Sequence, residues 1–287
     1  MSAQPSAALA VDWTTACRRA ADGLRAVMRD APTSRERVVE TGQRGEGGDQ
    51  TLVIDQLAED AVFSELERLH DEGARFTAVS EERGIVDFGD PDVLVVIDPI
   101  DGSMNAKRGL GSAALSIAVA DGPTMGDVVF GYVLDLGAGE EWWARRGGGV
   151  LLDGRPLPEP PPERRLADGR LELVALESAD PRYVGPAAPA LLEHAVRVRA
   201  LGAIAVSLAQ VALTRVDGMA TLWRCRAVDA AAAQLVVRES GGLVAFLGDG
   251  AGPLDAPLDL EPHAPVIAAR PPEAMERMRA IATAAGG

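Results

Sequence analysis

The sequence feature that most constrains this chain is VVIDPIDGS, residues 95–103, in which an apolar run leads directly into two aspartates. We interpret Val93–Asp98 as a buried strand that ends in a turn, because Pro99 fixes the backbone and Gly102 permits close approach of a ligand. Asp98 and Asp101 repel each other unless a proton or a cation lies between them. Carboxylate oxygens suit Mg²⁺, so the pattern predicts a magnesium site, the alternative being an Asx-type turn with surface aspartates.

Further acidic residues follow predicted structural elements elsewhere in the chain. Glu81 and Glu82 end the strand before VVIDPIDGS, and sites in α/β architectures gather at strand ends. Asp55 and Glu59 lie one helical turn apart, and Asp229 opens an alanine-rich helix. Each signal is weak alone, because a solvated acidic edge or an ordinary helix N-terminal charge explains it better when it is taken by itself.

The periodicity of the apolar residues predicts an α/β (α+β) protein with two lobes, 1–155 and 156–287. The first lobe is predicted to contain helices at Val11–Val39 and from Thr51 to Leu66, and strands at Arg75–Ser80, Val93–Asp98, Ala113–Ala120, Val128–Leu134 and Glu140–Arg146. The second is predicted to contain strands at Leu171–Leu176, Val196–Leu201, Gly218–Trp223 and Pro265–Ala269, and helices at Ala187–Ala195, Ile204–Thr214, Ala227–Glu239 and Pro271–Ala285. We expect a flexible glycine-rich loop at 41–49, a linker at 152–170, and Trp142 and Trp143 on opposite faces of their strand.

The charge of the chain limits its partners. With 28 basic and 43 acidic residues the formal charge is −15, which disfavours a nucleic-acid or anionic-membrane surface. A phosphorylated substrate would need a local positive source, which bound cations would supply. Cys17 and Cys225 offer neither a disulfide framework nor a zinc site, and no apolar stretch is long enough to span a membrane. We therefore expect a cytoplasmic protein.

Four segments together resemble the inositol monophosphatase family: VIDQLAEDAV, AVSEERG, VVIDPIDGSMN and RAVDAAAAQLVVRESGG. The resemblance covers nearly the whole chain and is closest to the archaeal-type branch, which includes dual enzymes acting on inositol monophosphate and fructose 1,6-bisphosphate. It implies a layered αβαβα fold and a homodimer. It also implies a phosphoric monoester hydrolase that uses two to three Mg²⁺ ions, with Mn²⁺ as a possible substitute.

The resemblance also implies a set of metal ligands. The first ion would be held by Glu81, Asp98 and the carbonyl of Ile100. The second would be held by Asp98, Asp101 and Asp229, and a third, weaker ion would bind Glu81 and water.

The remaining catalytic groups are carried over in the same way. Ser103 would pair with Asp55 to orient the attacking water, and Glu81 would act beside them. The amides of Gly102 and Ser103 would cradle the phosphate.

Substrate choice is less well defined by the sequence. Leu222 stands where animal inositol monophosphatases carry a glutamate that contacts inositol, which argues against strict inositol selectivity. Arg197, Arg199, Gly202 and Ala203 match positions near the substrate pocket, but the two arginines fit an exposed strand edge equally well.

Three function classes remain open at this point. The first is a small-molecule phosphatase for inositol 1-phosphate, fructose 1,6-bisphosphate or both. The second is a phosphatase for another small ester such as histidinol phosphate or NADP. The third is a non-catalytic regulatory protein with the same fold, which binds RNA-associated partners.

Overall fold

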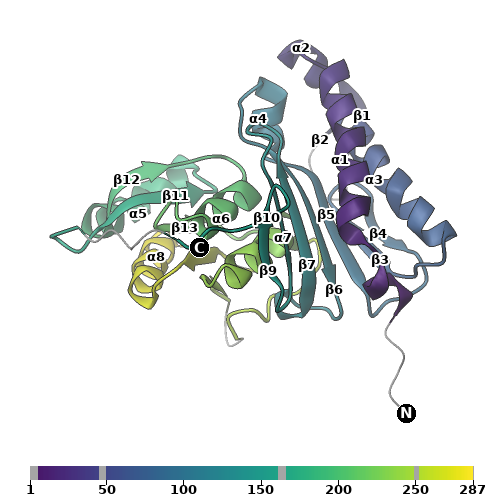
Figure 1. Cartoon of the computed structure of the whole chain (residues 1–287). Coiled ribbons are helices and arrows are strands. Elements are labelled where there is room, and N and C mark those ends of the chain that lie inside the picture. Colours follow the sequence, from purple (N-terminus) through teal and green to yellow (C-terminus); the bar gives the residue numbers. More distant parts are fainter. Residues whose placement is uncertain (1–5, 45–49, 161–165, 249–251, 287) are drawn as a thin grey trace.

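The computed structural model describes residues 6–44, 50–160, 166–248 and 252–286. Within these residues the chain forms five layers, and Figure 1 shows α1 and α3 on one outer side and α5 and α8 on the other. An eight-stranded sheet, the helices α6 and α7, and a five-stranded sheet lie between them. The predicted α+β class and the layered αβαβα arrangement are therefore confirmed.

The eight-stranded sheet has the order β10-β9-β8-β7-β6-β5-β3-β4. Its strands are β3 (Thr77–Ser80), β4 (Gly84–Asp87), β5 (Leu94–Asp101), β6 (Ala114–Ala120), β7 (Val128–Asp135), β8 (Glu141–Arg145), β9 (Gly149–Leu152) and β10 (Arg155–Pro156). The outer face is covered by α1 (Trp13–Asp30) and α3 (Val53–Asp71). Only β3 and β5 are parallel neighbours in this sheet, so their carboxyl ends meet at one edge.

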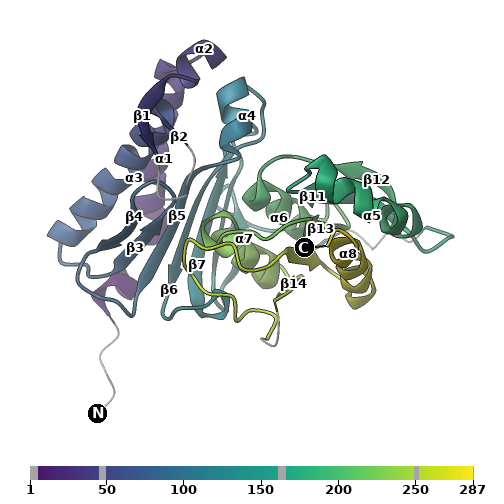
Figure 2. The same cartoon turned by 180° about the vertical axis from the view of Figure 1, so that it is seen from behind.

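The five-stranded sheet has the order β12-β11-β13-β15-β14. Its strands are β11 (Leu171–Glu177), β12 (Ala195–Arg199), β13 (Gly218–Thr221), β14 (Leu243–Phe246) and β15 (Val266–Ala269). The helices are α5 (Pro181–His194) and α8 (Pro272–Ala284) outside the sheet, and α6 (Ile204–Ala212) and α7 (Ala227–Glu239) between the two sheets (Figure 2).

The short elements are η1 (Ala7–Ala10), α2 (Ser34–Arg37), β1 (Glu40–Arg44), β2 (Gln50–Leu52), α4 (Ser103–Arg108) and η2 (Met125–Asp127). The observed elements correct three predictions. The helix predicted at Val11–Val39 ends at Asp30, because Pro32 disfavours helical torsions at Ala31. Residues 41–44 of the predicted loop belong to β1, and 45–49 lie outside the described residues. The predicted linker 152–170 contains β10, and its residues 161–165 are likewise not described.

The alanine-rich helix α7 allows the two sheets to pack closely. Ala230–Ala233 are all buried, and a Cβ at Gly131 of β7 would lie 2.4 Å from the carbonyl oxygen of Ala232. Small residues on both sides therefore bring α7 onto the sheet, which fixes the start of this helix beside the end of β5. Trp142 and Trp143 pack on opposite faces of the sheet, as predicted. Among the described helices, none has the length and apolar character needed to cross a membrane.

Candidate metal centre and cleft

The acidic residues predicted at strand ends meet at one edge of the larger sheet. Ser80 of β3 pairs in parallel register with Ile97 of β5, so Glu81 follows β3 beside the point where Asp98 occurs in β5. The predicted adjacency of these two strand ends is confirmed. Asp229 reaches the same place from the first turn of α7, which packs against β5 and β6.

Three buried aspartates form the centre of this site. Asp98, Asp101 and Asp229 each present a carboxylate oxygen, and these three oxygens lie within 4.8 Å of one another. Asp101 Oδ2 accepts a hydrogen bond from the amide of Ala205 at 2.7 Å, and its Oδ1 accepts from the amide of Ile204 at 3.2 Å. The start of α6 therefore fixes one carboxylate, while the start of α7 carries another.

The electrostatics of this cluster suit a divalent cation. Burial raises the pKa of Asp98 well above its ordinary value, and repulsion from Glu81 and Asp101 adds to the rise. Burial and repulsion from Asp229 likewise raise the pKa of Asp101 well above its ordinary value. Converging buried carboxylates are hard oxygen ligands whose repulsion a metal ion removes. The residues present therefore fit a metal ion.

Arg226 adds a positive charge to the cluster. Its Nη1 lies 2.7 Å from Glu81 Oε1, and its Nη2 lies 3.1 Å from Asp229 Oδ1. Burial raises the pKa of Glu81, and the Arg226 guanidinium opposes that rise. Sequence reasoning used the segment RAVD for its aspartate and for the family resemblance, and assigned no role to the arginine. Its position three residues before Asp229, at a helix start, was the available signal.

Asp55 and Ser103 line one narrow pocket together with Glu81. Asp55 is buried, and Lys107 Nζ of α4 lies 3.3 Å from its Oδ2. The amide of Leu52 donates to the same oxygen at 3.3 Å. Sequence reasoning missed Lys107, because α4 was not predicted.

Glu59, one turn after Asp55, is only 1% exposed. Asp55 is 7% exposed, so the alternative in which this pair forms a solvated acidic edge is wrong. The carboxylate of Glu59 accepts a hydrogen bond from the amide of Arg83 at 3.3 Å, which supports the turn that carries Glu81.

The three aspartates lie in the wall of a cleft of about 610 Å³. Its lining residues are Glu81, Asp98, Ile100, Asp101, Gly102, Ser103, Met104, Asn105, Glu177, Ser178, Ala179, Asp180, Tyr183, Ala200, Leu201, Gly202, Ile204, Arg226 and Asp229. Gly202 thus lies at the cleft as expected. A Cβ at Gly102 would lie 3.0 Å from that of Ala203, which places Ala203 directly behind the cleft wall.

The two predicted substrate arginines lie elsewhere. Arg197 and Arg199 are exposed on β12, an edge strand of the smaller sheet, and are not among the residues that line the cleft. Arg197 Nη1 lies 3.9 Å from Glu172, and Arg199 Nη1 donates to the carbonyl of Val198 at 2.8 Å. In this chain they occupy the exposed strand edge that was the alternative interpretation.

Leu222 also lies away from the cleft, and the expectation that the chain lacks strict inositol selectivity stays a prediction. Its side chain is fully buried in the apolar core beneath α5 and α8, so it does not face the cleft. Glu177, an acidic residue that sequence reasoning missed, does line the cleft. It accepts hydrogen bonds from the amides of Leu201 and Gly202, at 3.1 and 2.9 Å, and thereby fixes the cleft wall. Burial raises the pKa of Glu177 to about 7.

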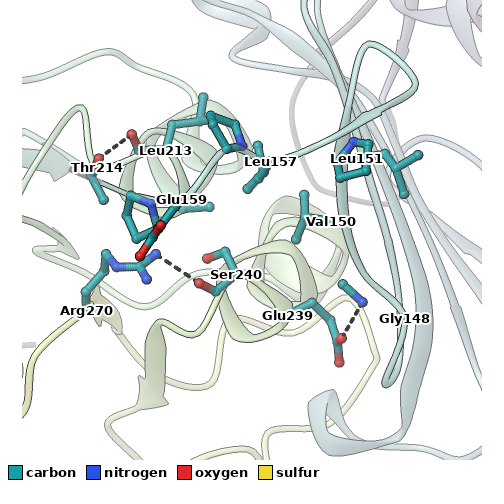
Figure 3. A pocket seen from close by; sticks show the side chains of 15 residues that line it. Gly148, Val150, Leu151, Leu157, Glu159, Leu213, Thr214, Glu239, Ser240 and Arg270 are labelled. Atoms are coloured by element: carbon teal, nitrogen blue, oxygen red, sulfur yellow. Dashed lines mark hydrogen bonds between the residues drawn. The ribbon is translucent and has the colours of Figure 1, made fainter.

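A second cavity, of about 380 Å³, lies between β9 and the ends of α6 and α7 (Figure 3). Two of its charged side chains, Glu239 and Arg270, make structural contacts. Arg270 Nη1 donates to the carbonyl of Ser240 at 2.9 Å, and Glu239 accepts from the amides of Gly147 and Gly149. The carboxylate-lined cleft is therefore the better candidate for chemistry.

Comparison with known proteins identifies the family of the chain. The inositol monophosphatase family matches residues 10–285. A fructose-1,6-bisphosphatase/inositol-1-monophosphatase of Thermococcus kodakarensis is 36% identical over 198 residues, covering 69% of this chain and 70% of that protein. Nus factor SuhB of Haemophilus influenzae is 31% identical over 214 residues, covering 73% and 76%. The structure of extragenic suppressor protein suhB from Bartonella henselae shares the fold with a TM-score of 0.76 at 24% identity, covering 94% of this chain and 98% of that chain.

Proposed function

The chain belongs to the inositol monophosphatase family, and on that premise we propose that it is a Mg²⁺-dependent phosphatase of small sugar or polyol phosphate monoesters. The observation that carries the proposal is the group of three buried aspartates, whose oxygens lie within 4.8 Å of one another at the base of an open cleft. A buried cluster of like charges is costly to a fold, and a metal-dependent reaction gives it a use.

We assign the ligands as the family resemblance implies. Glu81, Asp98 and the carbonyl of Ile100 would hold one ion, and Asp98, Asp101 and Asp229 a second. When bound, such cations lower the pKa of a coordinated water and neutralise charge on the phosphate ester. Mn²⁺ is expected to replace Mg²⁺, because it accepts the same oxygen ligands.

The chain's own residues would orient the water and the ester. Asp55 is fixed by the Lys107 ammonium and the Leu52 amide, so it can accept a proton or a hydrogen bond from a water held between it and Ser103. Gly102, with φ of +84°, turns the chain from β5 into α4. We assign the amides of Gly102 and Ser103 to the phosphate, because the start of a helix offers free N–H donors.

The substrate class follows from the cleft and the relatives. The residues that line the cleft come from both predicted lobes, and the cleft volume of about 610 Å³ accommodates a sugar or polyol phosphate. The Thermococcus relative is named for both fructose 1,6-bisphosphate and inositol 1-phosphate, which makes these two esters the first candidates. Histidinol phosphate and NADP remain candidates as other small esters. We also expect a cytoplasmic homodimer.

One observation favours a second candidate function. Nus factor SuhB of Haemophilus influenzae matches this chain over most of its length, so a regulatory role through a protein partner is the alternative to catalysis. The alternative gives no use to the buried aspartates, which is why we rank it second.

The test is phosphate release with Mg²⁺ from inositol 1-phosphate, fructose 1,6-bisphosphate, histidinol phosphate and NADP, measured side by side. We expect turnover of one or both of the first two esters, and loss of that turnover in excess chelator. No turnover of any ester, by protein that binds Mg²⁺, would favour the regulatory alternative.

A further inference from the structure

We propose that Arg226 is a built-in counter-ion that holds the carboxylates of Glu81 and Asp229 and competes with the divalent cation for both. This inference rests on the proposed function, since it concerns the same metal ligands. It assigns a role to a residue that the expected ligand set leaves unused.

The contacts place Arg226 between two ligands from different parts of the chain. Its guanidinium lies 2.7 Å from Glu81, in the turn after β3, and 3.1 Å from Asp229, in α7. All three side chains are largely enclosed, with exposed fractions of 24%, 17% and 10% for Arg226, Glu81 and Asp229. An ion pair this well enclosed is screened much less than a surface pair.

Both oxygens of Asp229 are directed to Arg226. Oδ1 accepts from the guanidinium at 3.1 Å, and Oδ2 accepts from the backbone amide of Arg226 at 3.3 Å. Asp101, in contrast, is held by the amides of Ile204 and Ala205, which are neutral donors. A metal ion that binds Asp229 must therefore share the Asp229 carboxylate with the guanidinium or displace the guanidinium from it. Binding of a metal ion to Asp101 displaces no cation.

The position of Glu81 agrees with this competition. The group of converging oxygens contains the three aspartates but not Glu81, whose carboxylate is instead paired with Arg226. For Glu81 to bind a metal ion beside Asp98, its ion pair with Arg226 must break, or the Glu81 carboxylate must bind the metal ion and the guanidinium at once. Because Arg226 lines the cleft, a displaced guanidinium would remain beside an entering phosphate ester.

The charge balance gives the direction of the effect. Glu81, Asp98, Asp101 and Asp229 bring four carboxylates to the cleft wall, and Arg226 offsets one of their charges. Without the guanidinium the carboxylates repel each other more strongly and attract a divalent cation more strongly. Removal of the arginine should therefore weaken the metal-free fold and tighten metal binding. If Arg226 had a purely structural role, its removal would weaken the fold without tightening metal binding.

The experiment is a calorimetric Mg²⁺ titration of the full chain, first stripped of metal with a chelator, at pH 8. We compare the wild type with Arg226→Met, which removes the charge, and Arg226→Lys, which keeps it without the two-pronged geometry. Arg224→Met is the matched control, because Arg224 is exposed two residues earlier and lies over the Trp223 ring, 5.6 Å from its centroid.

We expect Arg226→Met to bind Mg²⁺ roughly tenfold more tightly than the wild type, or more, on the basis of the charge removed. Arg226→Lys should fall between the two, and Arg224→Met should match the wild type. In thermal denaturation, Arg226→Met should melt below the wild type in chelator and gain more from added Mg²⁺.

Equal or weaker Mg²⁺ binding by folded Arg226→Met would overturn the inference. If that variant does not fold in chelator, Arg226→Lys decides by the same measurement, since wild-type-like or weaker affinity there would equally overturn it. A wild type that binds no Mg²⁺ would instead refute the proposed function on which the inference rests, so the two failures are distinguishable.

Discussion

Gly102 offers the sharpest test of how the fold shapes the cleft. Its φ is +84°, and a Cβ there would lie 2.8 Å from the carbonyl oxygen of Gly202 and 3.0 Å from that of Ser112. Left-handed torsions cost an L-residue about 1–2 kcal/mol, and overpacking against fixed neighbours adds about 1–3 kcal/mol. Gly102→Ala should therefore lower the free energy of unfolding by about 2–5 kcal/mol. The substitution should also reduce phosphate release, because Gly202, which forms part of the cleft wall, must move away from the new methyl group.

The matched control is at the other end of the same helix. Gly109 has a φ of +72°, but nothing lies within 4 Å of a Cβ placed there. Gly109→Ala should therefore cost only the torsional part, about 1–2 kcal/mol. Urea denaturation of both variants measures the difference between them. Equal destabilisation of the two variants would refute the argument that close approach of residue 202 requires glycine at 102.

Two other substitutions test buried positions. Burial raises the pKa of Glu59 from 4.5 to about 7, so the folded protein retains a proton that the unfolded chain releases, and stability falls as pH rises through about 7. Glu59→Gln should remove a loss of about 2–3 kcal/mol between pH 5 and pH 8, and urea denaturation that shows the same pH dependence in both proteins would contradict this. Leu222→Glu should destabilise the fold by more than about 3 kcal/mol, because the charge enters an apolar core. A folded Leu222→Glu protein of wild-type stability with a changed substrate preference would show that this side chain faces the cleft after all.

Much of the layered fold could be predicted from the sequence because its long elements have clear periodicity. The helix predicted at Ala227–Glu239 has those bounds in the structure, and the strands predicted in the first lobe are all present. The elements that were not predicted are short. They include β4, β10 and β14, strands of two to four residues that are too short to show a clear alternation of apolar and polar side chains.

Parts of the site were also accessible from sequence. VVIDPIDGS identified two of the three converging aspartates, because a buried strand that ends in paired carboxylates is locally distinctive. Arg226 and Lys107 were missed, because their importance comes from contacts with Glu81 and Asp55 across the fold.

The measurement that tests the central claim most directly compares Asp98→Asn with the wild type. Phosphate release from inositol 1-phosphate and fructose 1,6-bisphosphate is followed as Mg²⁺ is added, with circular dichroism as a check of folding. We predict that the folded variant releases phosphate about 10²–10³-fold more slowly, because one buried carboxylate of the cluster is lost. We also predict higher stability than the wild type in chelator, because burial and repulsion penalise the ionised Asp98. Wild-type turnover by folded Asp98→Asn would contradict the assignment of this cluster as the catalytic metal centre.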